Sequence, residues 1–337
     1  MQEPVLSVLF QFLEEVVVKK LVSLAAIAAV MFAGAAQAQE WPVKPVRFIN
    51  PFPAGGGTDT FARPLSAVLT KNLGQTFIVE NQGGAGGTVG AANAARAAGD
   101  GYTFFIGAVH HTIAPSVYLK LTYDLEKDFV PVTLLATVPN VLVLNQKTDF
   151  KTMKEFEAFV KANPGRLNYG SPGTGTSQHL SAELWKLHTK TFMVHIPYRG
   201  LGPAMQDFLA GNFEVMFDGL GASAAQIRAG KIRAIGMMSA QRHPQFPNIP
   251  TMAEQGYPGM EVSTWYAMWG IKGTPQPVLD KMYAEVIKAW ENPTLKKVWE
   301  VTGADFGGQK PAEFGKYVNS EIQRWAKVVK AAGIKLD

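Results

Sequence analysis

The hydrophobic positions of the chain alternate between short continuous runs and stretches with helical spacing. The run VRFINPF (46–52) ends before a cluster of glycines and predicts a buried strand. Residues 58–73 then carry apolar side chains at helical spacing. TFIVEN (76–81) and YTFFIG (102–107) predict two more strands, with a helix of small residues at 89–98 between them. This β-α-β-α-β order is typical of a mostly parallel sheet covered by helices on both faces.

A second series of strands and helices follows, framed by two long extended segments. The segments are VTLLATVPNVLVLN (132–145) and VSTWYAMWGI (262–271). Two helices, at 277–291 and 311–331, come after the second segment. The elements predicted between the two segments are strands at 167–171, 192–198, 213–219 and 232–239 and helices at 154–162, 176–189, 203–209 and 221–230.

Two α/β series joined by two extended segments predict a bilobed α/β fold, with two doubly wound lobes and a cleft between them. We expect residues 39–140 and 263–337 to form lobe 1 and residues 141–262 to form lobe 2. Ligands of open α/β sheets bind beyond the carboxyl ends of the strands. In a bilobed protein these ends face the cleft, so a ligand site is expected there.

The N-terminal region has the pattern of an export signal. Two lysines at 19–20 precede the alanine-rich apolar stretch 21–38, which ends in the sequence Ala-Gln-Ala. A membrane anchor is the alternative, but the composition and the absence of a following basic flank favour a signal peptide over residues 1–38, cleaved after Ala38. Residues 1–17 fit poorly because two glutamates precede the lysines, and they are interpreted as an extension upstream of the true start.

Composition narrows the class of protein. The 337 residues include no cysteine, which excludes a disulfide framework, thiolate metal sites and a cysteine nucleophile. The net charge is +5, and the basic residues are scattered without a run that would bind nucleic acid. This balance either favours anionic ligands mildly or has no functional meaning. An export signal without cysteines points to a bacterial periplasm.

A glycine cluster separates the first strand from the first helix. Gly55, Gly56 and Gly57 permit positive φ and let backbone N–H groups converge on one point. The first N–H groups of a helix lack partners, and the helix dipole adds positive potential there. Together these features predict an anion site. Thr58 or Asp59 is expected to cap the helix.

A second strand, glycine loop and helix occurs at residues 168–180, NYGSPGTGTSQHL. It adds the hydroxyl groups of Ser171, Thr174, Thr176 and Ser177 to the backbone donors. Either loop alone is explained equally well by packing. Two such loops, one in each predicted lobe, favour a single carboxylate held from opposite sides.

The absence of other motifs argues against an enzyme, a bound cofactor and a metal site. No P-loop occurs, and in GGAGGTVG (83–90) Val89 stands where a dinucleotide fingerprint needs its last glycine. No G-x-S-x-G elbow, no H-E-x-x-H motif and no spaced metal-ligand set is present. A hydrolase on the same scaffold is the alternative, with Ser177 and His179 as its remote candidate pair.

Five single residues have two interpretations each. His110 and His111 follow a strand and would point in opposite directions in an extended chain, so either one enters the cleft or both are loop residues. His179 either donates to an anion or caps its helix. Asp218 ends an apolar strand and either orients a donor group of the ligand or caps the next helix. The side chain of Arg199 contacts either a second carboxylate or solvent.

Long motifs along the chain resemble the substrate-binding proteins of tripartite tricarboxylate transporters, the Bug family. The resemblance covers essentially the whole chain after the predicted signal peptide. It implies a periplasmic binding protein of the type II-like, Venus-flytrap architecture, without enzymatic activity or cofactor and expected to be a monomer. The motifs are PFPAGGGTD, VENQGGAGGTVGA, DGYTFFIG, DFVPVTLLATVPNVLVLN, NYGSPGTGTSQHL, HIPYRG, VMFDGL and WAKVVKAAGIKLD.

The resemblance also implies a ligand site. In this family the two glycine loops grip one ligand carboxylate, largely through backbone N–H groups and ordered waters, and the Asp of an FD motif lies near the distal part of the ligand. His110 and the residue after it depart from the smaller residues usual at that turn, which alters the far end of the pocket and leaves the exact ligand undefined. The matching positions are Phe52, Ala54, Gly55, Thr58, Asp59, Ser171, Gly173, Thr174, Gly175, Thr176, His179 and Asp218.

The sequence and the resemblance together predict a periplasmic receptor for a small carboxylate. The ligand would be a dicarboxylate, a tricarboxylate or an aromatic carboxylate, delivered to the membrane permease subunits of a tripartite tricarboxylate transporter. A sensor that presents the carboxylate to a membrane signalling protein is an alternative, because it differs only in its partner.

Overall fold

A computed structural model of the chain describes residues 40–335, so the predicted signal peptide and its cleavage site lie outside the described residues. The elements below belong to the part of the chain from Lys44 onward. The strands are β1 (Val46–Asn50), β2 (Phe77–Asn81), β3 (Thr103–Ala108), β4 (Phe129–Asn145), β5 (Asn168–Ser171), β6 (Val194–Pro197), β7 (Val215–Gly219), β8 (Ile232–Met237), β9 (Ser263–Ile271) and β10 (Asp305–Phe306). The helices are α2 (Gly57–Leu73), α3 (Thr88–Ala95), α4 (His110–Val117), α5 (Met153–Ala162), α6 (Ser177–Thr189), α7 (Leu201–Ala210), α8 (Leu220–Arg228), α9 (Gln276–Ala289), α10 (Pro293–Glu300) and α11 (Pro311–Ala332), with short 3-10 turns η1 (Ala85–Gly87) and η2 (Ala253–Gln255).

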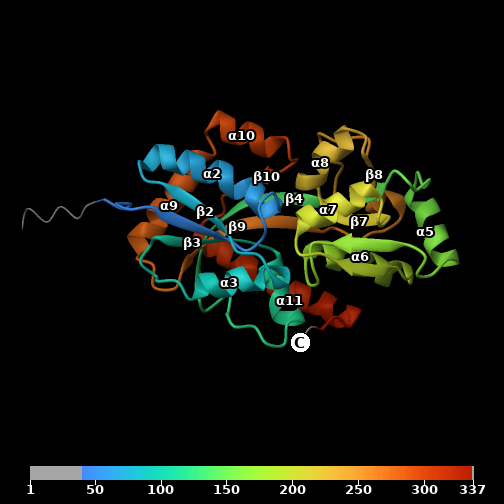
Figure 1. Cartoon of the computed structure of the whole chain (residues 1–337), viewed down its shortest axis with the longest axis horizontal. Coiled ribbons are helices and arrows are strands. Elements are labelled where there is room, and N and C mark those ends of the chain that lie inside the picture. The colour runs from blue at the N-terminus through green and yellow to red at the C-terminus, as the bar shows by residue number, and fades with distance from the viewer. Residues whose placement is uncertain (1–39, 336–337) are drawn as a thin grey trace, which may run out of the picture. The chain divides into compact units, whose positions relative to one another are not determined.

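The long strand β4 connects two groups of strands (Figure 1). Its residues 129–139 pair antiparallel with β9, and its residues 140–145 pair antiparallel with β7 and β8. On the β9 side, β3, β1 and β2 continue the sheet with parallel pairs between β1 and its two neighbours. On the β7 side, β5 and β6 continue it in parallel. The strand order β2-β1-β3-β9-β4-β7-β5-β6 thus confirms two α/β series linked through extended segments. The exact lobe boundaries stay a prediction.

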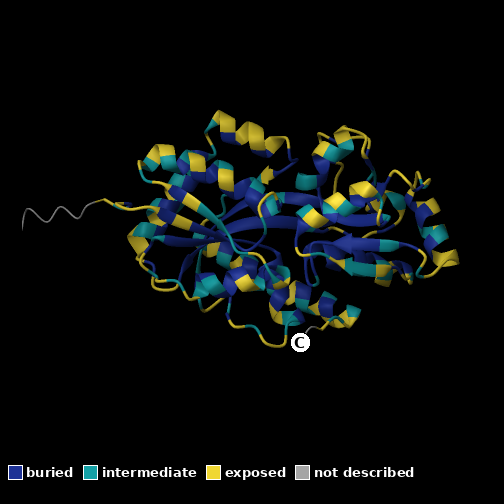
Figure 2. Ribbon diagram, in the orientation of Figure 1, coloured by how far each residue is buried: buried dark blue, intermediate teal, exposed yellow. Residues whose placement is uncertain are grey.

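Helices cover both faces of the sheet because its strands are apolar on both sides. Every residue of β3 is buried, as are all but one of β1 and β9. Helices α2 and α10 lie over one face near β2 and β10, and α3 and α11 lie over the other (Figure 1). The buried surfaces of these elements face the strands and the exposed ones face outward (Figure 2). The continuous apolar runs of the sequence therefore correspond to strands buried between helical layers.

The C-terminal helix α11 is fixed to β9 by a buried carboxylate. Oε2 of Glu321 accepts hydrogen bonds from Nε1 of Trp265 at 3.0 Å and from Nε1 of Trp325 at 3.1 Å. Its Oε1 lies 3.3 Å from Nη1 of Arg324. A buried charge is tolerated when it is paired and hydrogen-bonded, as it is here. The contact holds the last helix against the strand that reaches the candidate site.

Three local predictions differ from the structure. His110 and His111 are not in an extended loop but begin helix α4, where Oγ1 of Thr112 donates to the carbonyl of Val109 at 2.7 Å. Proline within that stretch hides the helix from sequence reasoning. Helix α10 was also not predicted, although Asn292 before a proline is a standard start, and its side chain accepts from the next two N–H groups. The N-cap of α2 is Gly56 and not Thr58 or Asp59.

Candidate ligand-binding cleft

Two joined cavities lie where the predicted loops meet. The outer cavity has a volume of about 340 Å³, and the inner cavity has a volume of about 20 Å³, room for about one water molecule. Phe52 and Pro172 line both. The other residues of the outer cavity are Pro53, Gly84, Ala85, Gly86, Gly87, Tyr118, Gly173, Thr174, Pro197, Tyr198, Arg199 and Gly200. The other residues of the inner cavity are Gly56, Gly57, Thr58, His110, Gln178, Leu201 and Tyr266.

The first glycine loop brings an uncapped helix N-terminus to the inner cavity. Gly56 is the N-cap of α2 and supplies no side-chain acceptor, and Gly57 and Thr58 form the start of the helix. All three line the inner cavity. The first N–H groups of a helix have no carbonyl partner within it. Because no side chain caps them, they are available to an anion in this cavity.

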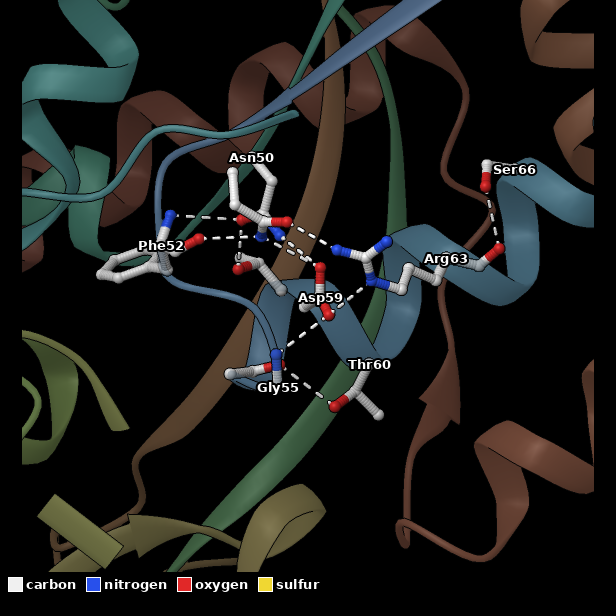
Figure 3. Close-up of polar contacts among 10 residues, drawn as sticks. Asn50, Phe52, Gly55, Asp59, Thr60, Arg63 and Ser66 are labelled. Carbon is white, nitrogen blue, oxygen red and sulfur yellow. Dashed lines mark hydrogen bonds and ion pairs between the residues drawn. The ribbon is translucent and has the colours of Figure 1, made fainter. Parts of the chain in front are cut away.

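Asp59 accepts hydrogen bonds that hold the first loop (Figure 3), and it lines neither cavity. Its Oδ2 accepts from the N–H of Gly55 at 3.0 Å and from Nε of Arg63 at 2.7 Å. Its Oδ1 accepts from the side-chain amides of Asn50 and Asn81. Burial works to raise the pKa of Asp59, but the hydrogen bonds from Arg63, Gly55 and Asn81 outweigh it and lower the pKa. The N–H of Gly55 therefore already has a hydrogen-bond acceptor within the protein.

Asn50 is the second centre of this network and was not identified from the sequence. Its Oδ1 accepts from Oγ1 of Thr58 at 2.6 Å and from the N–H of Phe52 at 3.3 Å. Asn50 is completely buried. The sequence feature that could have indicated its role is a polar residue at the end of an apolar strand. Of the five predicted residues of this loop, Phe52 and Thr58 line the cavities, whereas Ala54 and Gly55 are exposed and line neither.

The second glycine loop uses its donors internally. Thr176 caps α6, accepting from the N–H of His179 at 3.3 Å and donating to the carbonyl of Gly173 at 2.7 Å. Nδ1 of His179 accepts from the N–H of Gly175 at 3.2 Å, so His179 supports the loop and lines neither cavity. Gly173 and Thr174 do line the outer cavity. The two predicted loops are thus not equivalent.

A stack of rings lies beneath the second loop. The rings of His179 and His195 are 4.1 Å apart and nearly parallel, and the ring of Tyr169 is nearly parallel to both, at 4.8 Å from His195 and 6.3 Å from His179. Nε2 of His195 lies 2.7 Å from Oγ of Ser171, which in turn bonds to the backbone of Gly173. Ser171 is buried and lines neither cavity. Its hydroxyl therefore fixes the loop.

The N-terminus of α7 is uncapped and lies at the cavities, where the sequence predicted the N-terminus of α6. Gly200 is the N-cap of α7, without a side-chain cap, and lines the outer cavity, while Leu201 at the start of α7 lines the inner one. Gly200 has φ +117°, and a Cβ there would lie 2.9 Å from Cγ of Pro53. Glycine is needed because this turn touches the first loop. Helices α2 and α7 therefore both begin at the cavities.

The wall of the inner cavity holds a buried polar atom that needs a partner. Nε2 of His110 lies 3.1 Å from Oε1 of Gln178, and Nδ1 of His110 has no hydrogen-bond partner among residues 40–335. Burial, together with the charge of neighbouring His111, lowers the pKa of His110 to about 3, so the ring is neutral at pH 7. Buried polar groups are nearly always satisfied. Nδ1 of His110 is an exception in the wall of this cavity.

Asp218 lies behind this wall and lines neither cavity. It is fully buried, and its Oδ2 accepts from Oγ of Ser223 at 2.6 Å, while its Oδ1 has no partner within the described part of the chain. Burial raises its pKa to about 6, against the hydrogen bond from Ser223. Its charge also acts with burial to raise the pKa of Tyr266.

Several lining residues were not predicted as site residues. Tyr266 approaches α2 so closely that a Cβ on Gly57 would lie 2.1 Å from its hydroxyl. The hydroxyl of Tyr118 donates to the carbonyl of Thr174 at 3.1 Å, joining the two sides of the outer cavity. Gln178 had no signal beyond its place in the first turn of α6. These contacts depend on long-range packing that a local motif does not encode.

No group of three or more histidine, aspartate or glutamate side chains suited to a metal ion occurs within residues 40–335. Over the same residues, no helix is both long and apolar enough to cross a membrane.

The sequence matches a family model described as "Tripartite tricarboxylate transporter family receptor" over residues 61–334. The chain belongs to this receptor family. The resemblance drawn from its motifs is therefore confirmed.

Solved structures agree with this receptor family and confirm the two-lobe α/β periplasmic-binding-protein fold. The periplasmic binding protein BugD has 34% sequence identity and a TM-score of 0.84, over 88% of this chain and 100% of BugD. Rpa4515 of R. palustris, solved with adipate, has 34% identity and a TM-score of 0.85, over 88% of this chain and 100% of its own. MatC of Rhodopseudomonas palustris, with bound malate, has 34% identity and a TM-score of 0.82, over 86% of this chain and 100% of its own.

Proposed function

We propose that this protein is a periplasmic receptor that captures a small carboxylate in the joined cavities and delivers it to a tripartite tricarboxylate-type permease. The observation that carries the proposal is the meeting of two uncapped helix N-termini, α2 and α7, at one pair of cavities. Both helices direct unpaired N–H groups and the positive ends of their dipoles toward the same space.

The carboxylate binds with one end in the inner cavity, near the first N–H groups of α2 and α7. Charge-assisted hydrogen bonds from a preset backbone supply the affinity. His110 and Gln178 form the wall beside it. The rest of the ligand extends past Phe52 and Pro172 into the outer cavity.

Closure of the cleft explains how binding is reported to a permease. The contacts between Pro53 and Gly200 and between Tyr118 and Thr174 join the two sides of the outer cavity. Hinge closure around a ligand forms contacts of this kind. A ligand that binds the closed form better than the open form shifts the population toward the closed form. The permease then recognises the closed form, and no covalent chemistry is involved.

The neighbours support a carboxylate as ligand. Rpa4515 was solved with adipate and MatC with malate, and both share the fold and about a third of this sequence. The periplasmic location is supported by BugD, which is a periplasmic binding protein, and cleavage after Ala38 is part of the proposal.

The test begins with full-length protein expressed in a Gram-negative host and purified from the periplasmic fraction. N-terminal sequencing should start at Gln39. After partial unfolding and refolding to remove a carried-over ligand, the protein is heated with a panel of carboxylates and, as controls, the corresponding primary alcohols. A ligand that binds the native state raises the melting temperature. Stabilisation by carboxylates only is expected, and a folded protein stabilised by no carboxylate contradicts the proposal.

A further inference from the structure

The second glycine loop is held by an acceptor that works only while it carries no proton. The N–H of Gly175 donates to Nδ1 of His179 at 3.2 Å. A backbone N–H is a donor only, so Nδ1 is unprotonated and the proton of the neutral ring lies on Nε2. A proton on Nδ1 would place two donors face to face and break this hydrogen bond. The shape of the loop at Gly175 therefore depends on the charge of His179.

The ring of His179 is buried and faces titratable groups from three elements. On its own helix α6, Nε2 lies 3.9 Å from Oε1 of Glu183. That carboxylate also accepts from Nζ of Lys186 at 2.6 Å and from the hydroxyl of Tyr169 on β5. The ring of His195 on β6 is stacked at 4.1 Å. The carboxylate is therefore already paired, and a charged His179 would lie against a second histidine and near a lysine.

These surroundings keep the ring neutral while the loop is ordered. Burial is the largest cause, and together with the charge of Lys186 it lowers the pKa of His179 to about 4. Burial and the charge of His179 lower the pKa of His195 to about 3. In an open loop the ring of His179 would lie in water, where its pKa returns toward the ordinary value of 6.5. A fall in pH from about 6.5 to 4 therefore favours the open loop.

The same loop forms a wall of the outer cavity. Gly173 and Thr174, which directly precede Gly175, line this cavity. The carbonyl of Gly173 accepts from Oγ1 of Thr176 at 2.7 Å, and the carbonyl of Thr174 accepts from the hydroxyl of Tyr118 at 3.1 Å. These contacts tie the wall to the start of α6 and to the opposite side of the cavity. A change of conformation at Gly175 would therefore move the wall.

We propose that His179 is a positioning residue whose unprotonated ring holds the second glycine loop in its binding shape, so that uptake of a proton in acid opens the loop and releases the ligand. This inference rests on the proposed function, because it assumes that the ligand occupies the outer cavity. His179 lines neither cavity and acts through Gly175. The receptor thus holds its ligand in neutral surroundings and releases it in acidic ones.

The experiment measures binding by calorimetry between pH 7.5 and pH 5.0, with the acid that stabilises the wild-type protein most. His179→Asn keeps an acceptor near the position of Nδ1 but does not titrate, and His179→Ala keeps none. His243→Asn is the matched control, because Nδ1 of His243 also accepts a backbone N–H, from Gln245 at 3.2 Å, and His243 lines neither cavity. Protonation of the ligand itself affects all of these proteins equally.

At pH 7.5, His179→Asn should bind within about threefold of wild type, and His179→Ala should bind roughly tenfold more weakly because the N–H of Gly175 loses its acceptor. Between pH 7.5 and pH 5.0, the wild-type affinity should decrease roughly tenfold more than that of His179→Asn, as expected for uptake of one proton by the open loop. His179→Ala should show the same shallow profile as His179→Asn. His243→Asn should follow the wild-type profile.

Equal pH profiles for the wild-type protein and His179→Asn, or full affinity in His179→Ala at pH 7.5, would overturn this inference and leave the proposed function standing. Binding of no carboxylate by a folded wild-type protein at pH 7.5 would contradict the proposed function and the inference with it. Melting temperatures without ligand at each pH show whether a loss of binding reflects unfolding.

Nitrogen NMR of the histidine rings gives a second test, which does not depend on the folding of a variant. In the wild-type protein, His179 should take up its proton over the same pH range in which the ligand dissociates. A ring that stays neutral while the ligand dissociates would overturn the inference.

Discussion

Nε2 of His110 lies 3.1 Å from Oε1 of Gln178, and this contact joins helix α4 to helix α6 at the wall of the inner cavity. The two residues are 68 positions apart in the chain. Both side chains are buried, so water does not easily compete for this hydrogen bond. Burial raises the pKa of the nearby Asp218 to about 6, and the amide of Gln178 is among the groups that act against this increase. The amide of Gln178 therefore separates a buried carboxylate from the space proposed for the carboxylate of the ligand.

Replacing Gln178 by glutamate should weaken carboxylate binding by roughly tenfold or more, because a new negative charge would face the ligand in a poorly solvated site. Calorimetry with the best acid of the panel measures this effect. Gln241→Glu makes the same change at an exposed position away from both cavities and should not alter binding. An unchanged affinity in Gln178→Glu at pH 8 would mean that the anion does not lie beside this wall.

Gly57→Ala should abolish stabilisation by the ligand. The new Cβ would lie 2.1 Å from the hydroxyl of Tyr266, so the ring of Tyr266, which lines the inner cavity, must shift. Overpacking of this kind costs about 1–3 kcal/mol of unfolding free energy. Gly221→Ala in α8 is the control, because its Cβ would meet no atom closer than 3.8 Å. Thermal shifts with and without ligand separate the two effects, and a Gly57→Ala protein that binds normally would place the anchor elsewhere.

Asp59→Ala should destabilise the protein and weaken binding together. The substitution removes the acceptor for Gly55, Arg63, Asn50 and Asn81, and leaves buried donors unpaired. A loss of about 1–3 kcal/mol is expected for each buried group left unsatisfied, with partial relief by water at the exposed end of Arg63. Urea unfolding measures the change, and Asp280→Asn on the surface of α9 should lie within about 0.5 kcal/mol of wild type.

The buried histidines should make the protein less stable as the pH falls below about 6.5. Burial is the largest cause that lowers the pKa of His110 to about 3, of His179 to about 4 and of His195 to about 3, from an ordinary value of 6.5. The unfolded chain takes up these protons first, so the free energy of unfolding decreases from about pH 6.5 downward and is fully present above it.

Melting temperatures between pH 8 and pH 4.5 measure this dependence. His195→Gln should flatten the decrease, because one group that resists protonation is removed. A constant melting temperature across this range in the wild-type protein would contradict the neutral, buried state of the stacked rings.

Much of the architecture was readable in the sequence because it depends on local patterns. Continuous apolar runs predicted β3 and β9, and helical spacing predicted α2, although its start was placed at Thr58 and not at Gly57. Thr176 was predicted as the first residue of its helix, one position before the observed start at Ser177. These features follow from backbone geometry and from the burial of side chains within one segment, which any short window of sequence contains.

Tertiary structure alone decided which of these local features meet. It placed the uncapped start of α7 beside α2, assigned the donors of the second loop to His179 and Thr176, and brought Gln178 against His110. The sequence could offer two equivalent glycine loops, because each has the same composition. Whether an N–H group is free depends on side chains that arrive from distant segments. Those contacts are set by the packing of helices on the sheet, which no local pattern records.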